Sequence, residues 1–435
     1  MPPARIKLAD SVYLNIIETD KFKTNFISAE FMLPLRAETA SQASLLPAVL
    51  LRGTGKYPDM AALNKRFDYL YGSGIWQRVY KLGETQVIGF YSYVLADKYA
   101  LEPTPVLSEL TDMLGEVIFN PLTEADGGAF RSDYTEGEKR NLCDQIKAQI
   151  NNKGAYAVKR CYDEMCRGEA FAISAMGEVN AVEAITPASL YKFYRELLTT
   201  ARVELYFVGN TDVKALTAQL SALFARCANT VAPEPFTQVK RRADTVREVI
   251  EDQPVNQGKL SIGFRTDCTL RDRDYHVFAM FRELYGGSPS SKLFMNVREK
   301  LSLCYYCSAS PEAHKGLMVV SSGIEVKNKQ KAQDEILRQL ECVKNGEITQ
   351  SEMIAARNSL INGYRELYDD AGSLKGWYTS RLLAGRDDSP EDAAAALETV
   401  TAEEIAAMAK RVTLDTVYFL NGTLKAEEGS ENEDE

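Results

Sequence analysis

Alternating apolar and polar positions mark the strands of this chain. Residues 12–17 and 26–33 form two such runs joined by a polar segment, which predicts an antiparallel strand pair. Further strands are predicted at 75–80, 85–95 and 202–209. Apolar residues at helical spacing predict helices between them, at 41–51, 60–71, 105–118, 129–151, 155–167 and 186–198. A chain that mixes antiparallel strands and helices in this way predicts the α+β fold class.

The pattern begins again after a charged, proline-containing segment at 230–245. The second half is predicted to contain strands at 260–265 and 317–326 and helices at 275–285, 331–342, 350–367 and 372–383. The two halves also end alike, because Val203-Glu-Leu-Tyr-Phe-Val-Gly matches Thr416-Val-Tyr-Phe-Leu-Asn-Gly. These similarities predict an internal duplication.

The duplication predicts two homologous domains, 1–229 and 246–426, joined by a linker at 230–245. Each domain is expected to be a mainly antiparallel sheet with helices packed on one face. The length of 435 residues also favours two domains over a single core. Residues 427–435 are acidic and poor in apolar side chains, so we expect them to be a disordered tail.

The segment 281–310 contains the candidate chemistry. Gly286 and Gly287 begin a turn, and a helix is predicted at 290–301 with Leu293, Phe294 and Val297 on its apolar face. Arg298 lies in the last turn of this helix, and Tyr305 follows on a predicted strand. A guanidinium and a phenol on two rigid elements could hold a peptide carbonyl. The alternative is a surface arginine beside a half-buried strand tyrosine.

The charge balance excludes several classes of partner. With 61 acidic and 51 basic residues the net charge is −10, so neither nucleic acid nor an anionic membrane is suggested. No apolar stretch approaches the 18 residues of a membrane span. The first residues hold no apolar run behind a basic region, so we expect no signal peptide and a cytoplasmic location.

The cysteines and histidines exclude most metal sites. Eight cysteines are scattered along the chain, which favours free thiols in a reducing compartment. Cys304-x-x-Cys307 has redox or zinc spacing, but residues i and i+3 of a regular strand point to opposite faces, so both are predicted to be structural. His276 and His314 are the only histidines and are far apart, so no hydrolytic zinc motif is present.

At this point the residues resemble a known family. Arg52-Gly-Thr, Tyr57-Pro-Asp and a following helix that ends in Leu70-Tyr-Gly are similar to motifs of the insulinase/pitrilysin-type zinc metallopeptidases. So is GGSPSSKLFMNVREKLSLCYY at 286–306, and so is the duplicated α+β half. This superfamily includes the mitochondrial processing peptidases, so the resemblance implies a processing-peptidase-like fold.

The resemblance also implies that the catalytic zinc motif has been lost. Active members carry His-x-x-Glu-His at positions that here hold Ser44, Pro47 and Ala48. A hydroxyl, an imide ring and a methyl group cannot hold zinc or activate its water. The downstream glutamate ligand maps onto Glu136, but a single carboxylate binds a transition metal poorly, and a solvated helix residue is the alternative. We therefore expect no metal and no cofactor.

The family's second catalytic element is present. In active members an arginine and a tyrosine hold the substrate carbonyl and the developing oxyanion, and Arg298 and Tyr305 match this pair, with Tyr306 as the alternative register. Gly286 and Gly287 take the place of the glycine-rich loop of the non-catalytic processing-peptidase subunit, in a much shorter form. In two-chain bacterial enzymes of the family, one subunit keeps the zinc and the other keeps the pair.

The resulting hypothesis is a catalytically inactive subunit that forms a heterodimer with a zinc-bearing homologue around a peptide substrate. In isolation the chain is expected to form a homodimer. The alternative is a non-hydrolytic binding or scaffold protein of the same family, for which the resemblance implies a link to the 5-aminopentanol modification of elongation factor P. An active enzyme of another class has no supporting nucleophile or cofactor motif.

Overall fold

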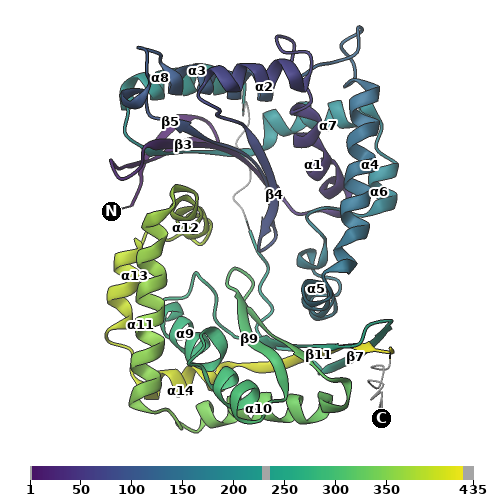
Figure 1. Ribbon diagram of the computed structural model, residues 1–435, viewed down its shortest axis with the longest axis vertical. Coiled ribbons are helices and arrows are strands. Elements are labelled where there is room, and N and C mark those ends of the chain that lie inside the picture. Colours follow the sequence, from purple (N-terminus) through teal and green to yellow (C-terminus); the bar gives the residue numbers. More distant parts are fainter. Residues whose placement is uncertain (1, 228–235, 425–435) are drawn as a thin grey trace, which may run out of the picture. The chain divides into compact units, whose positions relative to one another are not determined.

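The computed structural model describes residues 2–227 and 236–424 (Figure 1). Residues 230–235 of the predicted linker and the whole predicted tail, 427–435, lie outside the described residues. The described chain forms two compact units, each built around one β-sheet.

The first half of the chain contains β1 (Ala4–Ala9), β2 (Val12–Glu18), β3 (Thr24–Pro34), α1 (Ala37–Leu50), α2 (Met60–Tyr69), β4 (Trp76–Leu82), β5 (Thr85–Leu95), α3 (Val106–Phe119), α4 (Ser132–Ala148), α5 (Lys153–Met165), α6 (Val179–Glu183), α7 (Pro187–Thr200), β6 (Arg202–Gly209) and α8 (Val213–Phe224). The second half contains β7 (Arg247–Gln253), β8 (Gly258–Arg265), α9 (Tyr275–Arg282), the π-helical segments η4 (Glu283–Gly287) and η5 (Leu293–Lys300), β9 (Cys304–Glu312), β10 (Leu317–Ile324), α10 (Lys329–Lys344), α11 (Gln350–Glu366), α12 (Ala371–Leu383), α13 (Pro390–Leu397), α14 (Ala402–Arg411) and β11 (Thr413–Gly422). The sequence pattern did not predict β1, β7, α6, α8, α13 or α14.

Unit 1 contains a six-stranded sheet in the order β1-β2-β6-β3-β5-β4. The predicted pairing of β2 with β3 is wrong, because β6 lies between them. It pairs with β2 in parallel and with β3 antiparallel. Almost every residue of β6 is buried. A strand of this kind needs a hydrogen-bonded strand on each edge and packed side chains on each face, and only a central position in the sheet provides both.

Unit 2 contains a five-stranded sheet in the order β7-β11-β8-β10-β9. This order repeats β2-β6-β3-β5-β4 of unit 1, with the parallel pair β7–β11 in the place of β2–β6. The other strand pairs of both sheets are antiparallel. The repeated topology agrees with the predicted duplication, and the predicted α+β class with two mainly antiparallel sheets is confirmed.

One face of each sheet carries the main hydrophobic core. In unit 1, alternate residues of β2, β3, β5 and β6 pack against α1, α3, α7 and α8. In unit 2, residues of β8, β10 and β11 pack against α9, α10, α11 and α14. Most helices thus form a layer on one face, as predicted.

The opposite face of each sheet is covered by one helix from the other half of the sequence. In unit 1 this helix is α12, whose Ala371, Leu374 and Tyr378 pack against residues of β3 and β6 (Figure 1). In unit 2 it is α5, whose Met165 reaches Gly263 of β8. The predicted domains were continuous in sequence, whereas the compact units exchange the segments Gln149–Gly168 and Leu367–Ser389.

No helix within 2–227 and 236–424 has the length and apolar character that crossing a membrane requires.

Candidate functional site

Ser44, Pro47 and Ala48 lie on one face of α1, because residues i, i+3 and i+4 of a helix share a side. Ser44 and Pro47 are buried and Ala48 is half-buried, on the helix that also contributes Leu45, Leu46 and Val49 to the core of unit 1. Among the described residues, no group of three or more His, Cys, Asp or Glu side chains is placed to hold a metal ion. In this structure, Ser44, Pro47 and Ala48 therefore contribute to the packing of α1.

Glu136, the predicted remnant of the third zinc ligand, lies in the first turns of α4. Its carboxylate pairs with the Lys139 ammonium one turn later, at 3.0 Å, and 46% of its side chain is exposed. The neighbouring Glu138 carboxylate pairs with the Arg52 guanidinium at 2.9 Å. Glu136 is therefore a surface ion-pair partner in this structure, which matches the alternative interpretation made from the sequence.

Arg298 lies in the last turn of η5. Leu293 and Val297 anchor this segment, because both side chains are fully buried in the core of unit 2. Phe294, predicted to share the buried face, is half-exposed instead, and the Arg298 guanidinium lies 4.6 Å from the centre of its ring. The Glu299 carboxylate is 3.7 Å from Arg298 Nε. With 41% of the side chain exposed, Arg298 is accessible to solvent.

Tyr305 is the extra residue of a β-bulge on β9. Ile324 of β10 pairs with Cys304, and Gly323 pairs with Tyr306, so Tyr305 has no partner residue on the neighbouring strand. Bulges of this kind redirect side chains, often beside active sites. β9 is an edge strand, and 59% of Tyr305 is exposed.

Tyr306, the alternative register, lies in a different environment from Tyr305. A side chain on Gly323 would lie 2.6 Å from the Tyr306 ring, so glycine at that position leaves room for the ring. The Lys259 ammonium is 5.7 Å from the ring centre. Burial raises the pKa of the Tyr306 phenol, and the neighbouring Cys307 and Cys304 raise it further. Tyr305 is the more accessible of the two phenols.

The bulge also corrects the prediction made for the cysteines. Paired residues of adjacent strands share a face, and Cys304 pairs with Ile324 while Cys307 pairs with Ser322. Ile324 and Ser322 are two residues apart on a regular strand, so they point to the same side. Cys304 and Cys307 therefore share the core face of the sheet, and the prediction that they point to opposite faces is wrong.

Gly286 and Gly287 act in packing. Gly286 is buried in η4, and a Cβ atom there would lie 2.9 Å from the Ala309 Cβ and 3.0 Å from the Ala309 backbone nitrogen. At Gly287 a Cβ would overlap the side chains of Arg282 and Glu283. Glycine at these positions lets η4 approach β9, which supports the strand that carries the two tyrosines.

Arg298, Tyr305, Tyr306 and the glycine turn all belong to unit 2, whereas Ser44, Pro47, Ala48 and Glu136 belong to unit 1. Within the described chain, no hydrogen bond joins Arg298 to either tyrosine. The helix–strand junction η5–β9 thus presents two exposed, polar groups whose donors are available to another molecule.

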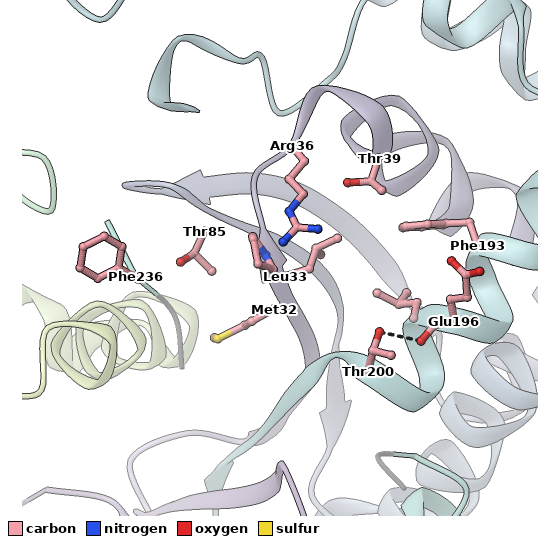
Figure 2. Close-up of a pocket in the computed structure, with 11 residues that line it drawn as sticks. Met32, Leu33, Arg36, Thr39, Thr85, Phe193, Glu196, Thr200 and Phe236 are labelled. Atoms are coloured by element: carbon pink, nitrogen blue, oxygen red, sulfur yellow. Dashed lines mark hydrogen bonds between the residues drawn. The ribbon is translucent and has the colours of Figure 1, made fainter. Parts of the chain in front are cut away.

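The pocket in Figure 2 contains none of the predicted site residues. It has a volume of about 330 Å³ and lies between the end of β3, the start of α1 and α7 in unit 1. Its lining is largely apolar, with Arg36 and Glu196 as the charged side chains, and the Thr200 hydroxyl donates to the Glu196 carbonyl at 2.8 Å (Figure 2).

A second pocket of unit 1, of about 570 Å³, was missed by the sequence analysis. Glu30 of β3 lines it, and its carboxylate pairs with the Lys375 ammonium of α12 and accepts a hydrogen bond of 2.8 Å from the Tyr80 hydroxyl. Burial and the Glu30 charge raise the pKa of Tyr80 far above its ordinary value. The Ser28 hydroxyl and the second Glu30 oxygen have no hydrogen-bond partner within the described residues. The signal in the sequence was a glutamate in the middle of an apolar strand.

The fold and the site together define an inactive homologue of a zinc metallopeptidase. Residues 184–360 match the family model described as "Peptidase M16 inactive domain". The chain is 36% identical, over 94% of its length and 95% of the relative's, to a protein of Bacillus subtilis described as "Probable inactive metalloprotease YmfF". The chain therefore belongs to the M16 peptidase family, which confirms the resemblance to insulinase-type peptidases.

Solved structures agree with this assignment. A conserved protein from Enterococcus faecalis V583 superposes with a TM-score of 0.90 at 29% identity, covering 98% of this chain and 100% of that one. A peptidase M16 inactive domain from Pseudomonas fluorescens gives a TM-score of 0.79 at 17% identity, with coverage of 98% and 100%, and shows the same fold.

Proposed function

We propose that this chain is the non-catalytic subunit of a two-chain zinc peptidase, and that it supplies Arg298 and Tyr305 to a peptide bound at the zinc of a homologous partner. The observation that carries the proposal is the exposure of both side chains at the η5–β9 junction. A buried and fully paired arginine could not donate to a substrate, whereas the Arg298 side chain is 41% exposed.

The chemistry assigned to the pair is electrostatic. As the scissile carbonyl is attacked, negative charge develops on its oxygen, and a guanidinium and a phenol placed beside it stabilise that charge. Phe294 orients the Arg298 guanidinium in advance, and the bulge orients Tyr305, so little reorganisation is needed at the moment of reaction.

The metal and the general base are proposed to come from the partner. Ser44, Pro47 and Ala48 supply neither imidazole nor carboxylate, so this chain has no means to activate water by the family's mechanism. A cytoplasmic heterodimer with a zinc-bearing homologue would complete the site, with a homodimer as the form of the isolated chain.

Kinetics of the reconstituted pair test the proposal. Arg298→Ala and Tyr305→Phe should each lower kcat/KM for a fluorogenic peptide by about 100-fold, because each removes a donor to the oxyanion. Arg365→Ala, which changes an exposed arginine of α11, is the matched control and should leave kcat/KM unchanged. An unchanged kcat/KM for Arg298→Ala, at unchanged affinity for the partner, would refute the oxyanion role.

The same assay decides whether Tyr305 or Tyr306 is the tyrosine that acts on the substrate. If Tyr306→Phe lowers kcat/KM and Tyr305→Phe does not, the phenol that acts on the substrate is Tyr306. The expected result is the reverse, because Tyr306 is half-buried against Gly323 and Tyr305 is exposed.

A non-hydrolytic binding protein is the second candidate, and the polar pocket around Glu30 favours it. A buried carboxylate oxygen without a partner would accept a hydrogen bond from a ligand. The link to elongation factor P modification belongs to this candidate. A complex that co-purifies with the chain from its native cell, contains no zinc-bearing homologue and hydrolyses no peptide would favour it over the peptidase pair.

A further inference from the structure

Cys304 and Cys307 flank the bulge at Tyr305 and share one face of β9. In a regular strand this spacing would separate the two thiols, so their placement on one face depends on the single extra residue. Both side chains lie against the core of unit 2, Cys307 within it and Cys304 at its edge.

The two thiols are unequal in access. Cys304 is half-buried and reachable from solvent, whereas Cys307 is 4% exposed. The pKa of Cys304 is lowered, because the Cys307 thiol donates a hydrogen bond to it, and the Ser322 hydroxyl and the Arg298 charge act in the same direction against partial burial. The pKa of Cys307 is raised by the same neighbour and by burial. An accessible thiol of lowered pKa beside a shielded thiol is the arrangement of an attacking and a resolving cysteine.

The other cysteines provide a contrast. Cys143, Cys161, Cys227 and Cys268 are buried, and burial raises the pKa of each. Cys342 is half-exposed like Cys304, but burial and the nearby Glu347 raise its pKa. Cys342 is therefore an accessible thiol without the activation that Cys304 has.

We propose that Cys304 and Cys307 are a peroxide-responsive pair that forms an intramolecular disulfide across the Tyr305 bulge. The Cys304 thiolate attacks one oxygen of hydrogen peroxide, the O–O bond breaks, and a sulfenic acid and hydroxide form, the latter taking a proton to become water. The Cys307 sulfur then attacks the Cys304 sulfur, the S–O bond breaks, and the leaving hydroxide takes the Cys307 proton as a second water. Two thiols are oxidised and one peroxide is reduced.

The disulfide has a consequence for the proposed function, on which this part of the inference rests. Tyr305 lies between the cross-linked residues, and the disulfide consumes the Cys304 thiol whose pKa the Arg298 charge helps to lower. Misplacement of a positioned group by about 1 Å can cost a 100-fold loss of rate. We therefore expect oxidation to lower kcat/KM of the reconstituted pair by at least about tenfold, and a thiol reductant to restore it.

Peptide mapping of the full chain tests the disulfide without any partner. After treatment of the native protein with hydrogen peroxide, the peptide that contains both cysteines should lose two hydrogen atoms, and the thiols titrated after denaturation should fall from eight to six. Cys342 should remain reduced at the same dose. A map in which Cys342 is oxidised while Cys304 and Cys307 remain reduced would overturn the proposal.

Cys307→Ser separates the two steps. In this variant Cys304 should stop at the sulfenic acid, which dimedone captures as a stable adduct, whereas Cys342→Ser should form the disulfide as the unchanged chain does. If Cys307→Ser fails to fold, the order of the two steps can be followed in the unchanged chain, where the dimedone adduct of Cys304 should be detectable before the disulfide has formed. A disulfide that forms without affecting kcat/KM would refute only the regulatory effect. An unchanged kcat/KM for Arg298→Ala would refute the proposed function, but it would not affect the proposal that the disulfide forms.

Discussion

Glu30 and Lys375 are separated by 345 positions in the sequence and form a buried ion pair in unit 1. Neither charge could be buried alone, because the loss of hydration would cost several kcal/mol. Their pairing, with the Tyr80 hydroxyl as a further donor, compensates this cost and fixes α12 on the sheet. The sequence indicated a charge in an apolar strand but not its partner, because nothing local to β3 points to a lysine on α12.

Lys375→Met should therefore destabilise unit 1 strongly. The substitution leaves the Glu30 carboxylate buried without a counter-charge, so the free energy of unfolding is expected to fall by about 3–5 kcal/mol. Urea unfolding followed by circular dichroism measures the change. Lys192→Met, at an exposed position of α7, is the control and should change the midpoint little. The double variant Glu30→Gln, Lys375→Met should lose less than Lys375→Met alone, and an equal or larger loss would contradict the role of the pair.

The helices and strands with strong periodicity were predicted correctly, and the elements that were missed have physical reasons. β7 alternates charged and apolar residues at the edge of its sheet, so its burial is only partial. β6 was predicted as a strand but not placed between β2 and β3. The local sequence pattern determines whether a segment forms a strand. Which strands it pairs with depends on the packing of the whole sheet, because buried side chains must be covered on both faces of that strand.

The docking of α5 is an element-scale feature that should depend on pH. Glu251 of β7 accepts hydrogen bonds of 2.8 Å from Tyr156 of α5 and from Tyr418 of β11. Burial opposes the charged form of Glu251, but hydrogen bonds from Tyr418, Tyr156, Gln253 and Arg160 outweigh it and hold its pKa below the ordinary value. A pKa lower in the folded state means that the carboxylate stabilises the fold above its unfolded pKa, about 4.3, and that this stability is lost as pH falls further.

Glu251→Gln should make unit 2 less sensitive to acid. The Tm of the unchanged chain is expected to fall between pH 6 and pH 3 by about 2–4 °C more than the Tm of the variant. Glu248→Gln, at an exposed position of the same strand, is the control and should follow the unchanged chain. Differential scanning calorimetry at several pH values measures the difference, and parallel curves for Glu251→Gln and the unchanged chain would argue against the assignment.

At the scale of the whole molecule, the chain is a duplicated fold in which each half supplies one helix to the sheet of the other unit. The half that would carry the metal in an active homologue holds Ser44, Pro47 and Ala48, and the half that carries Arg298 and Tyr305 keeps them exposed. This distribution of residues is the one that the proposed function, an activity divided between two chains, would require.

The isolated chain is accordingly expected to contain less than about 0.1 zinc per molecule, because a lone carboxylate binds zinc poorly. Elemental analysis of the purified chain measures the metal content. A chelator should leave the Tm of the isolated chain unchanged and should abolish the peptidase activity of the reconstituted pair. One zinc per isolated chain, or a Tm that falls when the chelator is added, would contradict this prediction.

The sequence by itself determined the class of the fold, the duplication and the family, because these depend on local periodicity and on motifs that are continuous in the chain. Arg298 and Tyr305 as the substrate-binding pair, and Ser44, Pro47 and Ala48 in place of the zinc motif, remain predictions that rest on the resemblance to the family. The tertiary structure alone decided the insertion of β6, the exchange of α5 and α12, the Glu30–Lys375 pair and the bulge that brings Cys304 and Cys307 to one face. Each of these depends on contacts between residues distant in sequence or on the register of a neighbouring strand, which no local pattern records.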